Sequence, residues 1–525
     1  MWTILLIVVL VSFYFKLRQI YNFWRERRVP YVKPVYILGN FARRAFRLGS
    51  MHDCVDKIYN TLPDVRCIGF YTFLQPMLMI RDLELIKQIT VKDFDSFSDH
   101  NTPVLPSVDK LWSKNLFSLT SDRGWNGVRA TVSPAFTGSK MRKMFVLMQD
   151  CSEQFVTYLK IKEGMITMEM KESFSRYGTD VIGSTAFGIT CNSLKEQNNE
   201  FYLMGKELTD LSGLKGLKLA VYSTSSTLAK LFSVKVVSDK VGKFFSHVIE
   251  QNLQERRNNQ IVRHDMIHML MKAQKGEIQQ DNEQTLDTGF PTVQEHNTLN
   301  TTRKSKIIIT DEDITAHATG FFFAGFETTS TLLSYLMYEL AVNPDIQNKL
   351  YLEIQQIKKN SNERITYEEL INMKYLDNVV AECLRLHSPV TVLDRKCTKS
   401  YTIEPKTRDE NAILIETGQK IWIPVRQIQR DPRFYPNPLK FDPNRFNDDN
   451  KNNIIPFTYL PFGIGPRNCL GSRFALLECK VITVDILRHF QLVCTDKTEI
   501  PIKLDSSNLT PFPKNGIWLG LNPRN

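Results

Sequence analysis

The sequence predicts a mainly helical α+β protein, a long helical body with small β-sheets behind a short apolar segment at the N-terminus. Three observations lead to this prediction. Residues 2–15 are apolar almost throughout. Between about Asp64 and Ile80, two runs rich in aliphatic and aromatic residues flank a turn and predict a β-hairpin. Residues 311–342 and 470–490 have the apolar pattern and the length of long core helices.

Composition supports a large buried core and an anionic partner. The chain has 525 residues, 42% of them hydrophobic, and its 67 basic and 56 acidic side chains give a net charge of +11. A basic balance favours a membrane surface, an acidic protein or nucleic acid as partner. The sequence has no zinc knuckle, RNP-type motif or concentrated basic helix, so we expect no nucleic-acid partner. Nine scattered cysteines in a long apolar chain fit a reducing compartment.

Residues 1–20 are predicted to form a membrane anchor. The run has no charge before Lys16 and no small-residue cleavage site after it, so we favour an uncleaved anchor over a cleaved signal peptide. The apolar stretch is short, but it extends through Leu17 and Ile20 if the side chains of Lys16 and Arg18 reach to the headgroups. Basic residues after the run place the body of the protein on the cytoplasmic side. Residues 21–34, basic and proline-containing, are predicted to be a linker.

The predicted helix at 311–342 has a clear N-terminal capping signal and carries an acid–hydroxyl pair in apolar surroundings. Thr310 is a helix cap, and three acidic residues follow it. Gly325 removes a side chain where a flat ligand could lie close. Glu327 and Thr328 place a carboxylate and a hydroxyl beside four phenylalanines. On the residues alone, the threonine hydroxyl can equally bond back to a carbonyl one turn earlier and bend the helix.

A glycine-rich loop brings one cysteine, Cys469, to the start of the last long helix. A helix N-terminus favours a thiolate. The glycines let the backbone turn tightly and approach something flat, and Arg467 can reach an anionic group beside the cysteine. An open thiolate in such a loop suits an axial metal ligand; the alternative is a buried structural cysteine. The spacing Phe-x-x-Gly-x-Arg-x-Cys-x-Gly is complete from Phe462 to Gly471.

This loop resembles the haem-binding loop of the cytochrome P-450 family, the haem-thiolate monooxygenases. Other motifs occur in the order of that family: Trp-x-x-x-Arg at Trp125, the acid–threonine helix, Glu-x-x-Arg at Glu382, and Phe-x-Pro-x-Arg-Phe ending at Phe446. Residues 133–141 resemble the insect microsomal branch, family nine especially. One departure is Gln429, where many members have histidine at a structural position. The resemblance implies the P-450 fold, with residues 35–525 as a single haem domain.

The resemblance also implies roles for individual residues. Cys469 is implied as the axial ligand of the iron in haem b, and Glu327 with Thr328 as the catalytic pair that relays protons. A buried structural network is implied for Glu382, Arg385 and Arg445. The implied cofactor contacts are Trp125, Arg129, Gly325, Arg395, Phe462, Gly465, Arg467 and Gly471. The implied substrate contacts are Phe117, Phe321, Ala324, Val390, Thr391, Val392 and Thr510.

The activity that the resemblance implies is NADPH- and O2-dependent oxidation of a lipophilic small molecule at the cytoplasmic face of the endoplasmic reticulum. Electrons would come from a flavoprotein NADPH–cytochrome P-450 reductase, with cytochrome b5 as a second partner, because the chain has no dinucleotide fingerprint of its own. The substrate stays open among xenobiotics, insecticides, plant toxins and endogenous lipids or hormones. Residues 201–245, mixed apolar and basic, fit either a plain amphipathic helix pair or contact with the membrane surface, and by analogy with the family we expect contact with membrane lipid. Two alternatives are a haem-thiolate isomerase or dehydratase and a non-catalytic haem protein.

Overall fold

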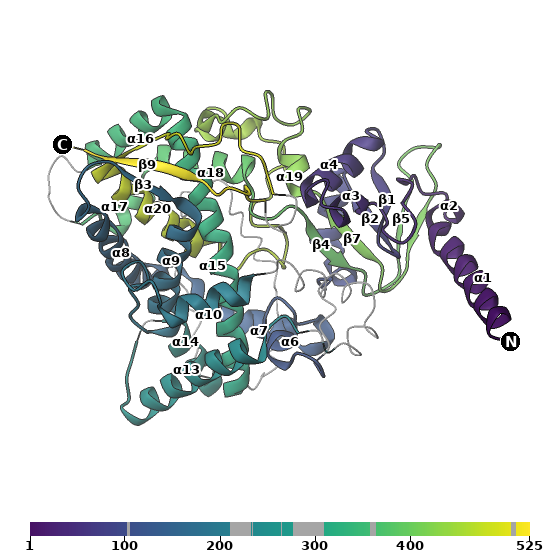
Figure 1. Ribbon diagram of the computed structural model, residues 1–525, viewed down its shortest axis with the longest axis horizontal. Coiled ribbons are helices and arrows are strands. Elements are labelled where there is room, and N and C mark those ends of the chain that lie inside the picture. Colours follow the sequence, from purple (N-terminus) through teal and green to yellow (C-terminus); the bar gives the residue numbers. More distant parts are fainter. Residues whose placement is uncertain are drawn as a thin grey trace.

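The computed structural model places a large helical part beside a smaller β-rich part, from which the N-terminal helix projects (Figure 1). This arrangement confirms the predicted fold class, mainly helical with small sheets. The structure describes residues 1–101, 106–210, 233, 235–263, 265–276, 309–357, 364–505 and 511–524. Thr510 lies outside the described residues, as do residues 211–232 and 234 of the proposed membrane-contact segment 201–245.

The largest sheet has four strands in the order β1-β2-β7-β4. The predicted hairpin forms its edge, with Cys67 paired to Ile80 in an antiparallel register. Strand β7 then runs parallel to β2 and antiparallel to β4. Two smaller sheets have the orders β3-β9-β8 and β5-β6. The strands are β1 Cys67–Thr72, β2 Gln75–Ile80, β3 Ile166–Glu169, β4 Leu393–Lys396, β5 Tyr401–Ile403, β6 Ile413–Ile415, β7 Lys420–Ile423, β8 Phe490–Val493 and β9 Trp518–Pro523.

Helix α15, Asp311–Val342, runs through the helical part and packs against the helices that surround it. Its start follows from local chemistry, because Thr310 and Asp313 form a reciprocal capping box. Its end precedes Pro344, which opens the next helix. The other helices that position the site are α4 Met51–Thr61, α6 Lys110–Lys114, α7 Trp125–Val132, α8 Gly138–Lys160, α9 Met170–Ile182, α18 Lys374–Leu386, α19 Val425–Gln429 and α20 Ser472–His489. The remaining longer helices are α10 Glu200–Thr209, α13 Asp239–Asn258, α14 Met266–Lys275 and α16 Pro344–Ile357.

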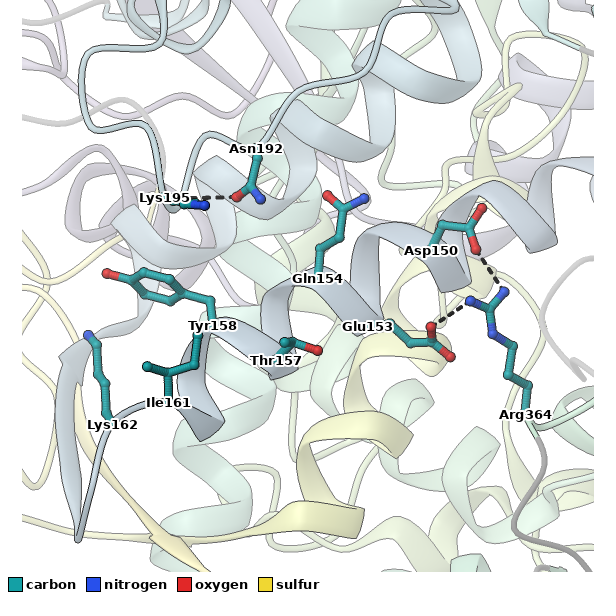
Figure 2. A pocket seen from close by; sticks show the side chains of 10 residues that line it. All are labelled: Asp150, Glu153, Gln154, Thr157, Tyr158, Ile161, Lys162, Asn192, Lys195 and Arg364. Atoms are coloured by element: carbon teal, nitrogen blue, oxygen red, sulfur yellow. Dashed lines mark hydrogen bonds and ion pairs between the residues drawn. The ribbon is translucent and has the colours of Figure 1, made fainter.

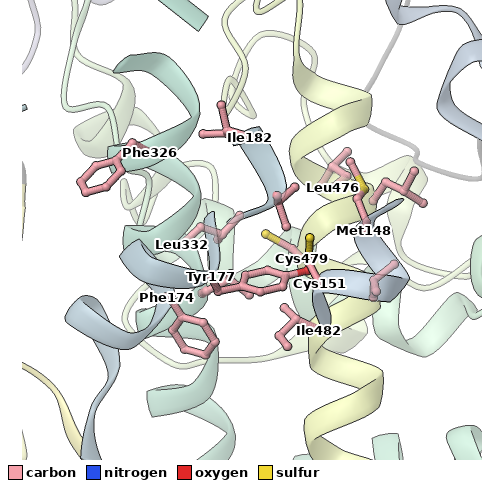
Figure 3. Close-up of a cluster of buried hydrophobic side chains, with 14 of the residues drawn as sticks. Met148, Cys151, Phe174, Tyr177, Ile182, Phe326, Leu332, Leu476, Cys479 and Ile482 are labelled. Carbon is pink, nitrogen blue, oxygen red and sulfur yellow. The ribbon is translucent and has the colours of Figure 1, made fainter. Parts of the chain in front are cut away.

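The main hydrophobic core lies where α8, α9, α15 and α20 meet (Figure 3). Met148 of α8, Phe174 and Tyr177 of α9, Leu332 of α15 and Leu476 of α20 all point into it. Each of these side chains is almost completely buried. This core fixes α15 against the helix that follows the cysteine loop, so the two predicted parts of the site are held by one packed body.

Helix α1, Trp2–Tyr21, is long and apolar enough to cross a membrane, and few of its residues are buried. Its last turn and the residues after it pack onto the first sheet. Trp24 is fully buried, and its indole Nε1 donates to the carbonyl oxygen of Phe70 at 3.2 Å. Gly69 admits the indole, since a Cβ there would lie 2.6 Å from the ring. The segment that follows α1 is therefore tied to the first sheet.

This packing predicts different outcomes for two truncations. Deletion of residues 2–15 removes only exposed side chains and should leave the free energy of unfolding of the body unchanged while membrane partition falls. Deletion of residues 1–28 also removes Trp24, and loss of a buried tryptophan costs about 3–5 kcal/mol. Thermal unfolding of the two truncated proteins in detergent measures the difference. Equal melting temperatures would contradict the tie between Trp24 and the sheet.

Candidate functional site

The loop before α20 turns tightly around Cys469. Gly463 and Gly465 have positive φ angles of 72° and 75°, which other residues adopt only with strain. The amide of Cys469 donates to the carbonyl of Phe462 at 2.8 Å. A Cβ on Gly465 would lie 1.9 Å from the carbonyl oxygen of Thr90. Glycine is therefore required at 465 for both backbone conformation and close approach of another chain segment.

Cys469 is one of two exposed cysteines in the described part of the chain. All nine cysteines lie in the described part of the chain as free thiols, and only Cys469 and Cys494 are exposed. Burial among the surrounding protein atoms raises the pKa of the Cys469 thiol, and the amide of Gly471 and the guanidinium of Arg129 act in the opposite direction. The thiol is thus sheltered by the protein while its surface remains open to a ligand, as a metal-binding position requires.

Two predicted arginines, Arg129 and Arg395, bond to this loop, and a third, Arg467, lies within it. The Nη2 of Arg129 donates to the side-chain oxygen of Asn468 at 2.7 Å. Arg395 donates from Nη1 to the carbonyl of Asp394 at 2.7 Å. Its Nε is buried without a hydrogen-bond partner among the described residues. Such a buried donor beside the loop suits an anionic group of a bound cofactor.

Arg467, the third of these arginines, is held chiefly by backbone carbonyls. Its Nε donates to Ser98 and its Nη2 to Leu119, both at 2.7 Å. The guanidinium lies 3.8 Å from the ring centroid of Trp125. This contact brings together the tryptophan motif and the cysteine loop, although 342 residues separate Trp125 from Arg467.

Sequence reasoning missed one polar pair at the same place. His100 Nδ1 lies 3.0 Å from Asp394 Oδ1, and the His100 ring stacks on Phe117 with 4.6 Å between centroids. Burial lowers the pKa of His100, and Asp394 opposes that shift. Burial alone would raise the pKa of Asp394, but His100 and the amide of Asn101 bring it well below its ordinary value. Neither residue carried a motif, so no local signal could have found the pair.

Helix α15 presents its acid and its hydroxyl in different directions. Thr328 and Ala324 are exposed in a helix whose other side chains are mostly buried. The Thr328 hydroxyl donates to the carbonyl of Ala324 at 2.6 Å, which is the back-bond that the sequence left open. Gly325 packs against α9, where a Cβ would lie 2.9 Å from Ile182 Cδ1. Glu327 forms an ion pair with Lys171 of α9 at 3.0 Å.

The implied substrate contacts occupy different environments. Phe117 and Val390 are 52% and 40% exposed, large values for apolar side chains. Phe321 and Val392 are half-buried. Thr391 is buried, and its hydroxyl lies 3.0 Å from His52 Nδ1. All these roles, with that of Ala324, stay predictions.

The predicted structural network is assembled on α18. Arg385 binds Glu382 through two nitrogens, at 2.7 and 2.8 Å, and both residues are fully buried. Arg445 approaches the same carboxylate at 3.3 Å. Gln429 joins the network from α19, because its carbonyl accepts from Arg385 and its side chain donates to the carbonyl of Leu384 at 3.1 Å. Glutamine therefore serves the structural position where the sequence departs from the family pattern.

A cavity of about 640 Å³ lies at a different place, on the outer side of α8 (Figure 2). Arg364 closes one end through ion pairs to Asp150 at 2.7 Å and Glu153 at 2.5 Å. None of its lining residues belongs to the candidate site. Because this cavity shares no residue with the cysteine loop, the loop stays the candidate for cofactor binding. In the described residues, no group of three or more His, Cys, Asp or Glu side chains could hold a metal ion.

The sequence of the whole chain was compared with known protein families and with curated proteins. The sequence profile of the family described as Cytochrome P450 matches residues 29–519. The chain is 41% identical over its full length to cytochrome P450 9e2 of Blattella germanica, of which 98% is covered. It is 39% identical to the probable cytochrome P450 9f2 of Drosophila melanogaster, with 96% of this chain and 95% of the relative covered. The corresponding values for cytochrome P450 6k1 of Blattella germanica are 34%, 98% and 96%.

The chain belongs to the cytochrome P450 family. The resemblance found in the sequence motifs is thereby confirmed, together with its likeness to insect members numbered in family nine. Cytochrome P450 enzymes are haem-thiolate monooxygenases, and the N-terminal apolar helix is consistent with a membrane anchor.

The residues present fit a haem. Cys469 offers an accessible thiol, and a Cβ on Gly471 would have no atom within 4 Å, so the loop leaves open space beside the thiol. The guanidinium groups of Arg129 and Arg395, the latter with a buried Nε that has no partner among the described residues, are the donors that haem carboxylates need. In this P450, Cys469 would hold the iron and these donors the carboxylates.

Proposed function

We propose that this P450 is an NADPH- and O2-dependent monooxygenase that oxidises a lipophilic small molecule. The observation that supports it most is the exposed Cys469 at the end of a glycine loop to which the guanidinium groups of Arg129 and Arg395 bond. When bound, the haem supplies iron that activates O2, and a thiolate ligand favours cleavage of the O–O bond. Electrons come from NADPH through a flavoprotein reductase, with cytochrome b5 as a second donor, at the cytoplasmic face of the endoplasmic reticulum.

The chain's own residues supply positioning and proton handling. Exposed apolar side chains such as Phe117 and Val390 offer a surface to a lipophilic substrate and exclude water from it. In this proposal the exposed Thr328 Oγ1 donates the proton, and the Glu327 carboxylate, paired with Lys171, supports the water path that returns protons to it. Xenobiotics, insecticides, plant toxins and endogenous lipids or hormones all meet the description of the substrate.

Turnover with and without reductase tests the proposal. The full-length protein in lipid should consume NADPH with its reductase and place one atom from labelled O2 into a lipophilic product. An isomerase or dehydratase would instead rearrange an organic peroxide without reductase, NADPH or O2. A non-catalytic haem protein would form neither product. Product without reductase, or no product from a broad lipophilic panel, would overturn the assignment.

Removal of the Thr328 hydroxyl should uncouple the enzyme. Thr328→Ala should fold and bind haem, because among the described residues the hydroxyl bonds only the carbonyl of Ala324 in its own helix. Electrons would still be consumed, but with proton transfer at Oγ1 lost they should end in hydrogen peroxide or water. Proton-transfer groups contribute about 10²–10⁴-fold to rates, so we expect product per NADPH to fall by at least about tenfold.

Product, NADPH and peroxide are measured together with an alkoxycoumarin that the wild-type enzyme dealkylates. Thr319→Val is the matched control, since Thr319 makes the same back-bond to Thr315 at 2.8 Å in a buried part of α15. An unchanged ratio in Thr328→Ala would mean that the hydroxyl serves only its helix.

A further inference from the structure

Lys171 of α9 reaches the turn of α15 that carries the acid–hydroxyl pair. Its ammonium donates to the carbonyl of Glu327 at 2.9 Å, to Ser330 Oγ at 2.9 Å and to Thr331 Oγ1 at 2.6 Å. It also lies 3.0 Å from the Glu327 carboxylate, and 5.5 Å from the ring centroid of Phe512. One ammonium therefore binds the main chain and the side chain of the same glutamate, together with two hydroxyls of the following turn.

The contact is partly withdrawn from solvent, with 17% of the Lys171 side chain and 22% of the Glu327 side chain exposed. Burial lowers the pKa of Lys171, and the neighbouring Glu327 carboxylate opposes that shift. Removing an ammonium from water is unfavourable unless acceptors replace the lost hydration. The four acceptors from α15 replace the lost hydration. The position of the Lys171 ammonium is therefore fixed by this helix turn, and the ammonium in turn holds the side chains of the turn in place.

The side chains of Glu327 and Thr328 point in different directions, and this determines what the Lys171 contact does. Successive residues of an α-helix point about 100° apart. Glu327 turns toward α9 and Lys171, whereas Thr328 is exposed on the side of Ala324. The carboxylate position relative to the Thr328 hydroxyl is therefore set by Lys171 and not by the helix alone.

We propose that Lys171 is a positioning residue for proton delivery, which holds the Glu327 carboxylate at a fixed place beside the turn of Thr328. The inference rests on the proposed function, in which Glu327 and Thr328 handle protons. The contacts of Lys171 in the described residues are with α15 and with the ring of Phe512. Because Lys171 acts on coupling through the Glu327 carboxylate, its effect on coupling should become small when Glu327 can no longer carry a charge.

The first test is a double-mutant cycle in the reconstituted full-length enzyme with the same alkoxycoumarin. Lys171→Met should lower product per NADPH by about tenfold, the scale on which partners that orient reactive groups act. Lys171→Arg should restore most of the loss, because it keeps the cation. In a Glu327→Gln background, Lys171→Met should cause little further loss, since coupled residues are non-additive. The solvent deuterium isotope effect on product formation should rise in Lys171→Met.

A second readout needs no turnover. Hydrogen exchange of the amides of residues 327–331 in the resting protein should accelerate in Lys171→Met and stay near wild type in Lys171→Arg. Lys114→Met is the matched control, because Lys114 also pairs with α15, to Glu312 at 2.8 Å, but 15 residues before Glu327. It should leave both the ratio and the exchange of residues 327–331 unchanged.

The outcomes separate this inference from the proposed function. Normal coupling in Lys171→Met, or additive losses in the cycle, would overturn the positioning role even if Thr328→Ala and Glu327→Gln are uncoupled. Normal coupling in those two variants would instead overturn the relay itself. If Lys171→Met fails to bind haem, Lys171→Gln keeps a donor without the charge, and a wild-type ratio in it would equally overturn the inference.

Discussion

Cys469→Ser should bind little haem and lose the thiolate-type absorbance of the reduced carbon monoxide complex. The reason is chemical, because a serine hydroxyl does not ionise near neutral pH and cannot replace a thiolate ligand. The loop itself should survive, since its turn depends on Gly463 and Gly465 and on the amide of residue 469. Monooxygenase activity should therefore fall to background in a protein whose circular dichroism remains helical. Haem content per chain and the carbon monoxide difference spectrum measure the result.

Cys494→Ser is the matched control for this substitution. Cys494 is the other exposed cysteine, and it follows β8 at a distance in sequence from the glycine loop. It should keep full haem content and the thiolate-type spectrum. If Cys469→Ser kept that spectrum and Cys494→Ser lost it, the ligand would be Cys494 and our assignment of Cys469 would be wrong.

Local chemistry explains why much of the fold could be predicted. The start of α15 follows from Thr310 and the acidic first turn, and its end from Pro344. The hairpin of β1 and β2 pairs within one short stretch, so its pattern was visible in the sequence. The glycine loop was likewise complete over ten residues. Each of these features is encoded by neighbours along the chain.

Contacts between distant segments were not visible in the same way. Lys171 and Glu327 are 156 residues apart, and His100 and Asp394 are 294 apart. Periodicity and caps state which face of a helix is apolar, but not which polar side chain of another element will meet it. The contact of Trp24 with Gly69 could not be predicted either, because nothing in the basic stretch around Trp24 indicates which distant residue leaves room for its indole. The orientation of Glu327 toward α9 thus required the packed structure.

The buried Glu382–Arg385 pair has no access to water that could replace a lost partner. Both side chains are fully buried and joined by two hydrogen bonds, and Arg385 Nη1 also donates to the carbonyl of Gln429 at 2.7 Å. Burial raises the pKa of Glu382, and Arg385 and the amide of Asp442 oppose that rise. The pair links α18 to the segment before the cysteine loop, because Gln429 also accepts from the amide of Leu460 at 2.8 Å. Its integrity therefore bears on whether the loop forms.

Arg385→Ala and Glu382→Ala should each lose about 3–5 kcal/mol of the free energy of unfolding, since the surviving charge is left unpaired in the core. Against a total stability of about 5–15 kcal/mol, this loss should appear as aggregated, haem-poor protein and not as a folded but slow enzyme. Arg445→Ala should cost less, because Arg445 contacts the carboxylate at 3.3 Å and its side chain is 13% exposed. Soluble yield, haem per chain and thermal unfolding measure the three variants, and Arg445→Ala should be the least affected. A soluble, haem-replete Arg385→Ala protein with wild-type stability would show that the network is dispensable for folding.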